Sequence, residues 1–366
     1  MAGAHRQPPR RRAAVSPARR WLPRAVSVSL VVVFVLTGLV LSDLRAPSDS
    51  SDSSTTDVPV VPAVAERATV AVQETATEVS TRRVQKHAVK LIERRERIQR
   101  RAQARAARLE KERREARRLK KLQSTPFTFT IGSFNVLGSQ HSTKGGQKPS
   151  YPSASVRTPR AASLARSHGV HILGTQELQE DQLNGLTAQT GMKAYPGYAW
   201  GAAETDNSIL YDPAVFDFVS GDSFHITFMG RSRPQAVLRL KHKKTQRELY
   251  VVNAHPSAGG GKYAAERAAG HHTIAAKVRE LRATGLPVLL TGDMNDREQF
   301  YCRVVATTDL TASNGGGTGC APPPQPMPVD WVVGAGVSWS NYHRDTTPVD
   351  QKTSDHFFIS ATATVD

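Results

Sequence analysis

Side chains suited to metal binding and proton transfer stand at the ends of strand-like segments in the last two-thirds of the chain. Six short motifs carry them: Ser133–Asn135, Thr175–Glu177, Asn253–His255, Gly292–Asn295, Val329–Trp331 and Ser354–His356. An anionic phosphoester resists attack, so its hydrolysis needs a hard cation and a base that makes hydroxide from water. Mg²⁺ takes oxygen ligands, commonly one or two carboxylates with water. The motifs together therefore indicate a divalent-metal phosphoesterase site.

Asp293 and Asn295 follow the apolar run Val288–Leu290 and stand two residues apart. In an extended segment this spacing places both side chains on one face. One of them can move a proton while the other fixes water or phosphate. His356 can donate to a phosphate oxygen when a carboxylate holds its tautomer and charge, and Asp330 is the expected partner.

The order of these motifs resembles the endonuclease/exonuclease/phosphatase superfamily, which includes DNase I-like nucleases, apurinic endonucleases, inositol polyphosphate 5-phosphatases and neutral sphingomyelinases. The resemblance covers residues 126–366. It implies an α/β catalytic domain of the DNase I-like type, a four-layer sandwich of two packed β-sheets flanked by helices. It also implies Mg²⁺-assisted, in-line attack of water on a phosphodiester or phosphomonoester.

The resemblance assigns roles residue by residue. Glu177 would hold the metal ion, with Asn135 assisting and Asp355 close by. The expected cofactor is Mg²⁺, with Mn²⁺ or Ca²⁺ as alternatives. Asp293 would activate the attacking water or protonate the leaving oxygen, and Asn295 would orient that group.

Other positions have less definite roles. His255 would be a second histidine facing the phosphate, whereas Asn253 more simply supports the backbone. Some nucleases of the superfamily carry a further carboxylate upstream of the middle histidine. The nearest segment here, Thr205–Ser208, does not align clearly, so the choice between one and two metal ions stays open, and Asn207 is only an additional candidate.

Four basic or imidazole side chains are interpreted as structural or solvated. His271 and His272 are neighbours on an expected helix, where side chains one residue apart diverge, so a shared metal ion is not expected. Arg160 and Lys262 could contact phosphate, but ordinary solvation is the simpler interpretation.

Charge is distributed unevenly along the chain. Residues 1–24 contain seven arginines and no acid, residues 43–81 contain two arginines and seven acids, and residues 82–121 contain 18 Lys or Arg and five Glu. Removing these contributions of +7, −5 and +13 from the formal net charge of +17 leaves +2 for residues 122–366. The basic character therefore belongs to the N-terminal third.

An uncharged run of 17 residues, 25–41, is at the short end of what spans a membrane. The arginine-rich tail 1–24 precedes it and an acidic, Ser-rich segment follows, which predicts a cytoplasmic N-terminus and a catalytic domain outside the cell. A cleaved signal peptide, giving a secreted protein, is the alternative. Residues 42–80 are rich in Ser, Thr, Asp and Pro over much of their length, which predicts a disordered linker.

Residues 81–122 lack Gly and Pro and are rich in helix formers, which predicts a long basic helical stalk. Its seven-residue rows are apolar early and interrupted by charge later, so a coiled coil competes with a solvated single helix. The stalk could contact anionic lipid, a surface polymer or nucleic acid. In the catalytic domain, Cys302 and Cys320 are the only cysteines, and a disulfide between them agrees with export.

From residue 126 onward, apolar runs alternate with helical patterns. Strands are expected at 127–135, 170–174, 207–211, 235–240, 249–253, 287–291 and 330–333. Helices are expected from Thr158, as N-cap, to Gly169 and over residues 263–283.

The favoured function is a membrane-anchored, outward-facing nuclease that uses a divalent metal. The alternatives are a phospholipid or sphingomyelin phosphodiesterase, a phosphatase of small phosphoesters, and a non-catalytic surface-binding protein. A fold alone does not choose among these substrates.

Overall fold

The computed structural model describes residues 63–366, with side chains described from residue 67. The chain divides into two compact units, residues 1–85 and 86–366. The expected tail 1–24 and membrane span 25–41 lie outside the described residues. Within the part that is described, no helix has the length and apolar character needed to cross a membrane.

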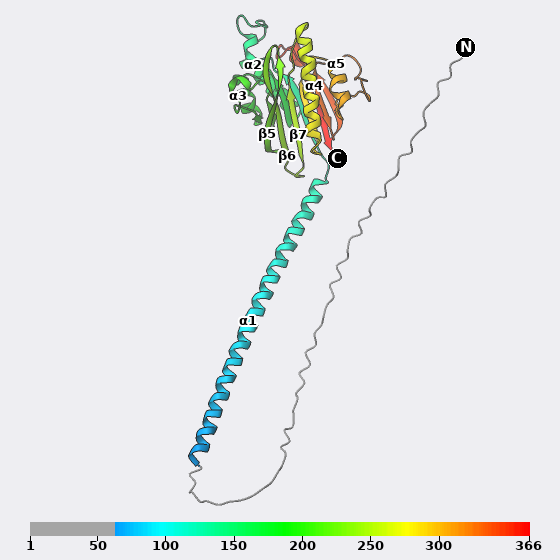
Figure 1. Ribbon diagram of the computed structural model, residues 1–366. Coiled ribbons are helices and arrows are strands. Elements are labelled where there is room, and N and C mark those ends of the chain that lie inside the picture. The colour runs from blue at the N-terminus through cyan, green and yellow to red at the C-terminus, as the bar shows by residue number, and fades with distance from the viewer. Residues whose placement is uncertain (1–62) are drawn as a thin grey trace, which may run out of the picture. The chain divides into compact units, whose positions relative to one another are not determined.

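The first element, α1, runs from Ala63 to Gln123 (Figure 1). A helix is confirmed over 81–122, but it begins 18 residues earlier than expected, so the disordered linker is wrong for residues 63–80. The physical reason lies in composition. Residues 63–123 contain neither Gly nor Pro, and Ala and Glu sustain the helix through the segment interpreted as linker.

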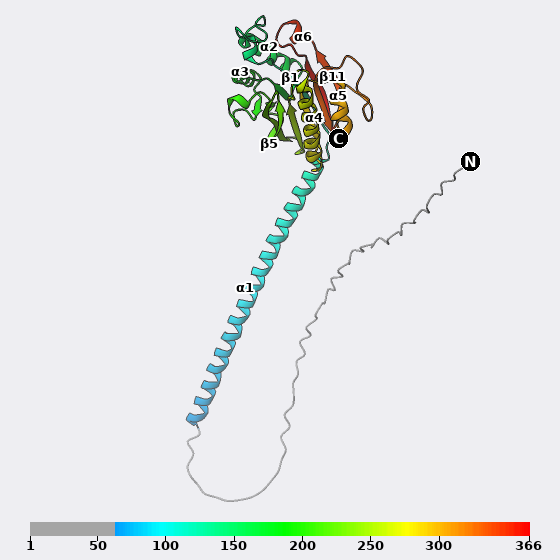
Figure 2. The ribbon, with the colours of Figure 1, turned by 45° about the horizontal axis from the view of Figure 1, so that its top comes forward.

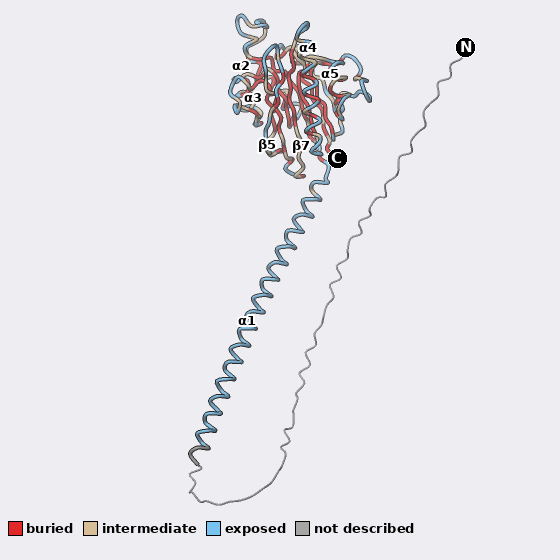
Figure 3. Tube along the Cα trace, in the orientation of Figure 1, coloured by how far each residue is buried: buried red, intermediate tan, exposed pale blue. Residues whose placement is uncertain are grey.

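The side chains of α1 are exposed from Arg67 to Lys121 (Figure 3). The apolar seam keeps 67% of Val84, 52% of Leu91 and 58% of Ile98 exposed. Pairs one turn apart, such as Arg108 with Glu112 at 2.9 Å, add about 0.3–0.5 kcal/mol each. Nothing within the described chain covers the seam, and the coiled coil stays a prediction.

Two mixed sheets of six strands form the catalytic domain. The first sheet has the order β11 (Ser338–Asp345), β12 (Phe358–Val365), β1 (Phe127–Asn135), β2 (Ile172–Gln176), β4 (Ile209–Tyr211) and β3 (Lys193–Tyr195). The second has the order β5 (Phe216–Phe228), β6 (Arg231–His242), β7 (Glu248–Ala254), β8 (Val288–Asp293), β10 (Asp330–Ala335) and β9 (Thr311–Ala312).

Helices lie outside both sheets (Figure 2). The α-helices after α1 are α2 (Ala154–Ser167), α3 (Glu180–Thr190), α4 (Lys262–Arg282), α5 (Glu298–Arg303) and α6 (Thr347–Asp350). Single turns of 3₁₀ helix occur at Ser139–Ser142, Ala202–Glu204 and Val305–Thr307.

Three apolar layers hold the sandwich together. The central layer lies between the sheets and includes Ile131 and Ile172 of one sheet and Leu238 of the other, all without exposed surface. A second layer joins the first sheet to α2 and α3, and a third joins the second sheet to α4 and α5. The expected four-layer fold is therefore confirmed, and its sheets are the most deeply buried elements (Figure 3).

Some element boundaries differ from expectation. The helix α2 begins at Ala154, with Ser153 at the N-cap, so Thr158 is a buried helical residue and not the cap. Pro159 therefore lies inside the helix. The other end is as expected, because α2 ends at Ser167 and Gly169 takes φ +59°, a conformation that glycine adopts without strain.

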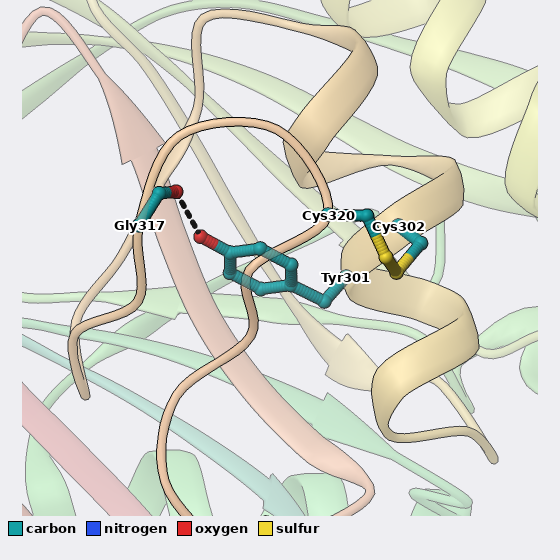
Figure 4. Close-up of a disulfide and its surroundings, with 4 residues drawn as sticks. All are labelled: Tyr301, Cys302, Gly317 and Cys320. Carbon is teal, nitrogen blue, oxygen red and sulfur yellow. Dashed lines mark hydrogen bonds between the residues drawn. A yellow bond between two sulfur atoms is a disulfide. The ribbon is translucent and has the colours of Figure 1, made fainter.

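A disulfide joins Cys302 of α5 to Cys320, with Cα atoms 4.6 Å apart, as expected (Figure 4). It closes a glycine-rich loop that includes Gly316 at φ +114°. Beside it, the hydroxyl of Tyr301 donates to the carbonyl of Gly317 at 2.7 Å. The loop is thus held by one covalent and one polar link to the same short helix.

Candidate active site

Strand order brings the predicted residues to one edge of the sandwich. Strands β1 and β2 are parallel, as are β7 and β8, so the carboxyl ends of each pair meet. Asn135 ends β1, Asp293 ends β8, and Glu177 follows β2 directly. The antiparallel strand β10 begins at this edge, where its register places Asp330 opposite Asp293. His356 arrives on the segment that leads into β12.

His356 lies between two carboxylates. Its Nδ1–H donates to Asp330 at 3.0 and 3.1 Å, and its Nε2 is 3.6 Å from Asp293 Oδ2. Burial disfavours the charged ring, but the negative charges of Asp330 and Asp293 raise the pKa of His356 well above its usual value. His356 is therefore an imidazolium at neutral pH, and the pairing expected from sequence is present.

Asp293 is almost completely buried, with 1% of its surface exposed. Burial opposes its ionisation, but the positive charge of His356 and the hydrogen bond and charge of His255 hold its pKa well below its usual range. The backbone N–H of Asn295 donates to its Oδ1 at 2.9 Å. Burial instead raises the pKa of Asp330. Asp293 is thus the more acidic of the two carboxylates.

Asn135 connects Glu177 to Asp293. Its Nδ2 donates to Glu177 Oε1 at 3.0 Å and to Asp293 Oδ2 at 3.2 Å, while its Oδ1 accepts from the N–H of Leu137. The amide nitrogen, and not the oxygen, therefore faces both carboxylates. In this arrangement Asn135 positions the two acids and is not placed as a metal ligand.

Glu177 takes φ +59°, an uncommon conformation for a residue with a side chain. Burial would raise its pKa, but hydrogen bonds from His141 and Asn135 and the charge of His255 outweigh burial and lower the pKa to about 2. Glu177 is consequently ionised throughout the physiological range.

Two basic side chains from the segment after β1 contact the carboxylates of Glu177 and Asp355. His141 Nε2 is 3.3 Å from Glu177 Oε2, and Lys148 Nζ is 2.9 Å from Asp355 Oδ2. The hydrogen bond with Glu177 raises the pKa of His141, and the hydrogen bond with Asp355 raises the pKa of Lys148. The sequence motifs gave no signal for either residue, because both lie in a loop without regular periodicity.

Arg157 of α2 holds this loop through hydrogen bonds. The guanidinium is 1% exposed. Its N–H groups donate to six backbone or hydroxyl oxygens, those of Pro152, Val136, Leu137, Gly138, Thr353 and Ser142. An arginine remains charged when buried, so this hydrogen bonding compensates for lost hydration. Arg157 therefore positions the residues that follow β1 and the segment that leads to His356.

Glu177 and Asp355 present carboxylates that are accessible to a divalent cation. Their carboxylates are 24% and 27% exposed, so an ion from solvent can reach hard oxygen ligands there. Asp293, Asp330 and His356 also have ligand atoms within 4.8 Å of one another. That trio is already hydrogen-bonded internally, and its two aspartates are each 2% exposed or less. Glu177 and Asp355 are therefore the better match for a metal site.

Two expected roles change in the structure. His255 is 3% exposed, and its Nε2 is 3.4 Å from Asp293 Oδ2, so it contacts the buried carboxylate and does not face an open phosphate position. Burial lowers its pKa, but Asp293 raises it more. Asn295, at φ +50°, donates through Nδ2 to the carbonyl of Pro256 at 3.1 Å. It therefore also braces the turn after β8.

Asn253 stands between the two sheets, as a backbone support. Its Nδ2 donates to the carbonyls of Thr175 and Ser208, and its Oδ1 accepts from Gln176 at 2.7 Å. The sheets approach closely here. A Cβ added to Gly174 would lie 2.0 Å from Thr291 Oγ1 and 2.7 Å from Asn253 Oδ1. Glycine at this position therefore permits the contact that aligns β2 with β7 and β8.

Asn207 belongs to a neighbouring buried network. Its Nδ2 donates to Gln235 Oε1 at 3.1 Å, and Asp206 beside it forms an ion pair with Arg233. Burial raises the pKa of Asp206. Gln235 in turn accepts from the backbone of His255 at 2.7 Å. Asn207 thus supports the site through Gln235 and His255, with no direct contact to Asp293.

The remaining basic side chains are outside the centre. Arg160 donates to the carbonyl of Gln351, and Lys262 lies 5.0 Å from the ring of Tyr263. His271 is fully buried, is 3.1 Å from the carbonyl of Met294, and has a pKa lowered to about 4 by burial. His272 is exposed. The two histidines thus diverge, as expected.

With the geometry established, comparison with known proteins gives the family. Residues 132–356 match the Endonuclease/Exonuclease/phosphatase family. The chain belongs to this family. Members of the Endonuclease/Exonuclease/phosphatase family are phosphoesterase hydrolases and generally use divalent metal ions. No curated protein matches the sequence significantly.

Solved structures share the fold. An endonuclease/exonuclease/phosphatase family protein from Bacteroides thetaiotaomicron is 19% identical, with 66% of this chain and 96% of that chain covered, at a TM-score of 0.51. One from Bacteroides vulgatus is 16% identical, covering 66% and 100%, at 0.52. The human Nocturnin catalytic domain with bound sulfate is 15% identical, covering 64% and 94%, at 0.50. At these sequence identities the similarity shows a shared fold alone.

Proposed function

We propose that this protein is a divalent-metal phosphodiesterase whose leading substrate is a nucleic-acid strand. The observation that carries the proposal is His356, held as an imidazolium between Asp330 and the ionised Asp293. A cationic donor beside a buried anionic base is suited to a substrate that gains negative charge at phosphorus.

In the proposed reaction, water attacks phosphorus in line with the leaving oxygen. Asp293 accepts the proton of the attacking water, and its low pKa keeps the carboxylate unprotonated at neutral pH. His356 donates a hydrogen bond to a non-bridging oxygen as charge develops there, and Asp330 holds the imidazolium in orientation. The bond from phosphorus to the leaving oxygen then breaks, and that oxygen takes up a proton from solvent water to leave as an alcohol.

The metal ion would be held by Glu177 and Asp355. When bound, it supplies charge neutralisation at the phosphate oxygens. His141 and Lys148 occupy positions against the same two acids and would have to yield part of these contacts. The protein's own contribution is to keep Glu177 ionised and, through Asn135, at a fixed position beside Asp293.

Two other substrates compete with nucleic acid. A phospholipid or sphingomyelin diester is favoured by the apolar run at residues 25–41, and a small phosphoester is favoured by the modest charge of +2 over residues 122–366. The basic residues of α1 favour an anionic polymer. The site chemistry is the same for all three classes, so the substrate must be identified by turnover.

The test is hydrolysis by the full-length protein, prepared with its disulfide intact. Substrates are single- and double-stranded DNA, RNA, sphingomyelin, phosphoinositides and bis(p-nitrophenyl) phosphate, each with Mg²⁺ and with EDTA. We expect metal-dependent cleavage of nucleic acid that falls at least about 100-fold in Asp293→Asn and His356→Gln. Preferential cleavage of a lipid or small ester would reassign the substrate, and cleavage that both variants retain would refute the site.

We also propose that the catalytic domain acts outside the cytosol, anchored through residues 25–41. The disulfide between Cys302 and Cys320 supports this, since such bonds persist in oxidising compartments. The test uses cells that express the chain with a C-terminal tag. Protease added to intact cells should remove the tag from the membrane fraction. Retention of the tag by intact cells but not by lysed cells would place the domain inside.

A further inference from the structure

A cavity lies beside the proposed catalytic centre. It has a volume of about 350 Å³ and shares His356, Asp330 and Asp355 with that centre. The cavity is also lined by Arg297, Arg344, Phe357 and the segment Pro326–Pro328. This volume is at the small end of ligand-sized cavities and admits about one nucleotide-sized unit.

Two arginines from separate elements, the N-cap of α5 and strand β11, line this cavity. Arg297 follows β8, and its Nε donates to the carbonyl of Met327 at 2.8 Å. Arg344 of β11 donates through one terminal nitrogen to the adjacent carbonyl of Pro326 at 2.8 Å. Each guanidinium is thereby fixed by one backbone bond while most of its N–H groups remain uncommitted.

The cavity carries uncompensated positive charge. Among the described residues, neither Arg297 nor Arg344 forms an ion pair with a carboxylate. The two acids that line the cavity are otherwise engaged, because Asp330 holds His356 and Asp355 pairs with Lys148. Guanidinium groups with free N–H forks recognise phosphate oxygens bidentately. Both guanidinium groups therefore have N–H groups available to an anionic ligand.

The rest of the wall suits an organic body attached to that anion. The Arg344 guanidinium lies 5.3 Å from the centre of the Phe357 ring, which orients its plane. Pro326, Met327 and Pro328 add apolar surface. A phosphate on a compact, partly apolar unit matches this lining better than a free inorganic ion does.

We propose that Arg297 and Arg344 bind a second phosphate of the substrate, one unit away from the phosphate that is hydrolysed. The inference rests on the proposed phosphodiesterase function and narrows its substrate class to diesters in which one alcohol carries a further phosphate. A nucleic-acid strand and a small bisphosphorylated alcohol share this chemistry. The group between the phosphates occupies the cavity beside His356.

Turnover of matched probes tests the proposal. The first pair is the p-nitrophenyl ester of thymidine 5′-phosphate with and without a 3′-phosphate. The second replaces the nucleoside with propanediol. In the native protein, the second phosphate should raise kcat/KM about 10- to 100-fold, as expected for charge-assisted hydrogen bonds. In the double variant Arg297→Gln, Arg344→Gln, that preference should fall to about 2-fold or less.

A matched control is Arg166→Gln. Arg166 is also an exposed arginine that donates to a single backbone carbonyl, that of Gln189, but it lies outside the cavity. Its variant should keep the preference for the second phosphate. A gain with both probe pairs means that phosphate alone is recognised. A gain in kcat/KM with the thymidine pair alone means that the nucleoside also contributes to recognition. A preference that persists in the double variant overturns the proposal.

Binding separates this inference from the proposed function. Calorimetry with thymidine 3′,5′-bisphosphate should show affinity at least about 10-fold tighter than with thymidine 5′-phosphate, and the double variant should lose this difference. Cleavage of bis(p-nitrophenyl) phosphate without any bisphosphate preference would remove the cavity proposal and leave the function intact. Folded protein that binds the bisphosphate preferentially but cleaves no ester would refute the proposed phosphodiesterase function and support the phosphate site in the cavity.

Discussion

At the scale of single residues, the charge state of His356 determines how activity depends on pH. The proposed reaction needs Asp293 ionised and His356 protonated. The pKa of Asp293 is held well below its usual value, so loss of activity on the acid side lies below about pH 4. The pKa of His356 is raised well above 6.5, so activity persists at neutral pH and falls as pH rises through that pKa.

Asp330→Asn tests this account. Removing one carboxylate charge lowers the pKa of His356, because less negative charge then favours the imidazolium. We expect kcat/KM at pH 7 to fall about 100-fold and the alkaline limb of the pH profile to move to lower pH. Asp309→Asn, at an exposed aspartate paired with Arg282, should leave the profile unchanged. An unshifted limb in Asp330→Asn would contradict the assigned pairing.

Metal affinity should depend on His141. Glu177 has a pKa of about 2, so the carboxylate does not titrate near neutrality. The pKa of His141 is raised by its hydrogen bond with Glu177, and below that pKa the imidazolium competes with the cation. Mg²⁺ affinity, followed by calorimetry, should therefore strengthen as pH rises through that pKa.

His141→Gln should flatten this dependence, whereas His272→Gln, at an exposed histidine, should preserve it. A slope that is equal in native protein and His141→Gln would show that another group controls metal binding.

At the scale of elements, apolar runs predicted the strands that flank the motifs, since β8 and β10 are continuous buried segments and β7 is buried from Val251 to Ala254. Strand β12 was missed because, after Phe358 and Ile359, its residues 360–364 are only Ser, Ala and Thr, which lack bulky side chains. The bond from Asn135 to Asp293 joins residues 158 positions apart, and no local pattern encodes it. Arg157 and Arg160 look alike in sequence, and only the packing of α2 buries the former.

Gly174→Ala tests the contact between the sheets. The added Cβ would meet Thr291 Oγ1 and Asn253 Oδ1 inside van der Waals distance, so the sheets must separate. We expect the free energy of unfolding to fall by about 1–3 kcal/mol and kcat to decrease, because β2 carries Glu177. Urea unfolding measures the first effect and diester hydrolysis the second.

Gly260→Ala is the control, since no atom lies within 4 Å of its added Cβ and its φ is outside the left-handed region. It should change stability by about 0.5 kcal/mol or less. Equal effects of the two substitutions would show that space at Gly174 is unimportant.

At the scale of the whole molecule, the disulfide restrains a loop that the apolar layers leave on the surface. Opening the link between Cys302 and Cys320, which are 18 residues apart, should lower the free energy of unfolding by about 3 kcal/mol. The variant Cys302→Ser, Cys320→Ser should show this in urea unfolding. Reducing agent should destabilise native protein equally and leave the variant unaffected. A smaller response of native protein would mean that other contacts order the loop.

The placement of β12 affects how the protein is made. This strand, Phe358–Val365, pairs with β1 at Phe127–Asn135, and Thr353 accepts from the buried guanidinium of Arg157. The first sheet is therefore completed by a segment that a ribosome produces long after β1. A nascent chain that ends before residue 356 contains Glu177 and Asp293 but neither the imidazolium nor the strand beside β1. Enzymatic competence should consequently arise only after residues 356–365 have been synthesised and have left the ribosome.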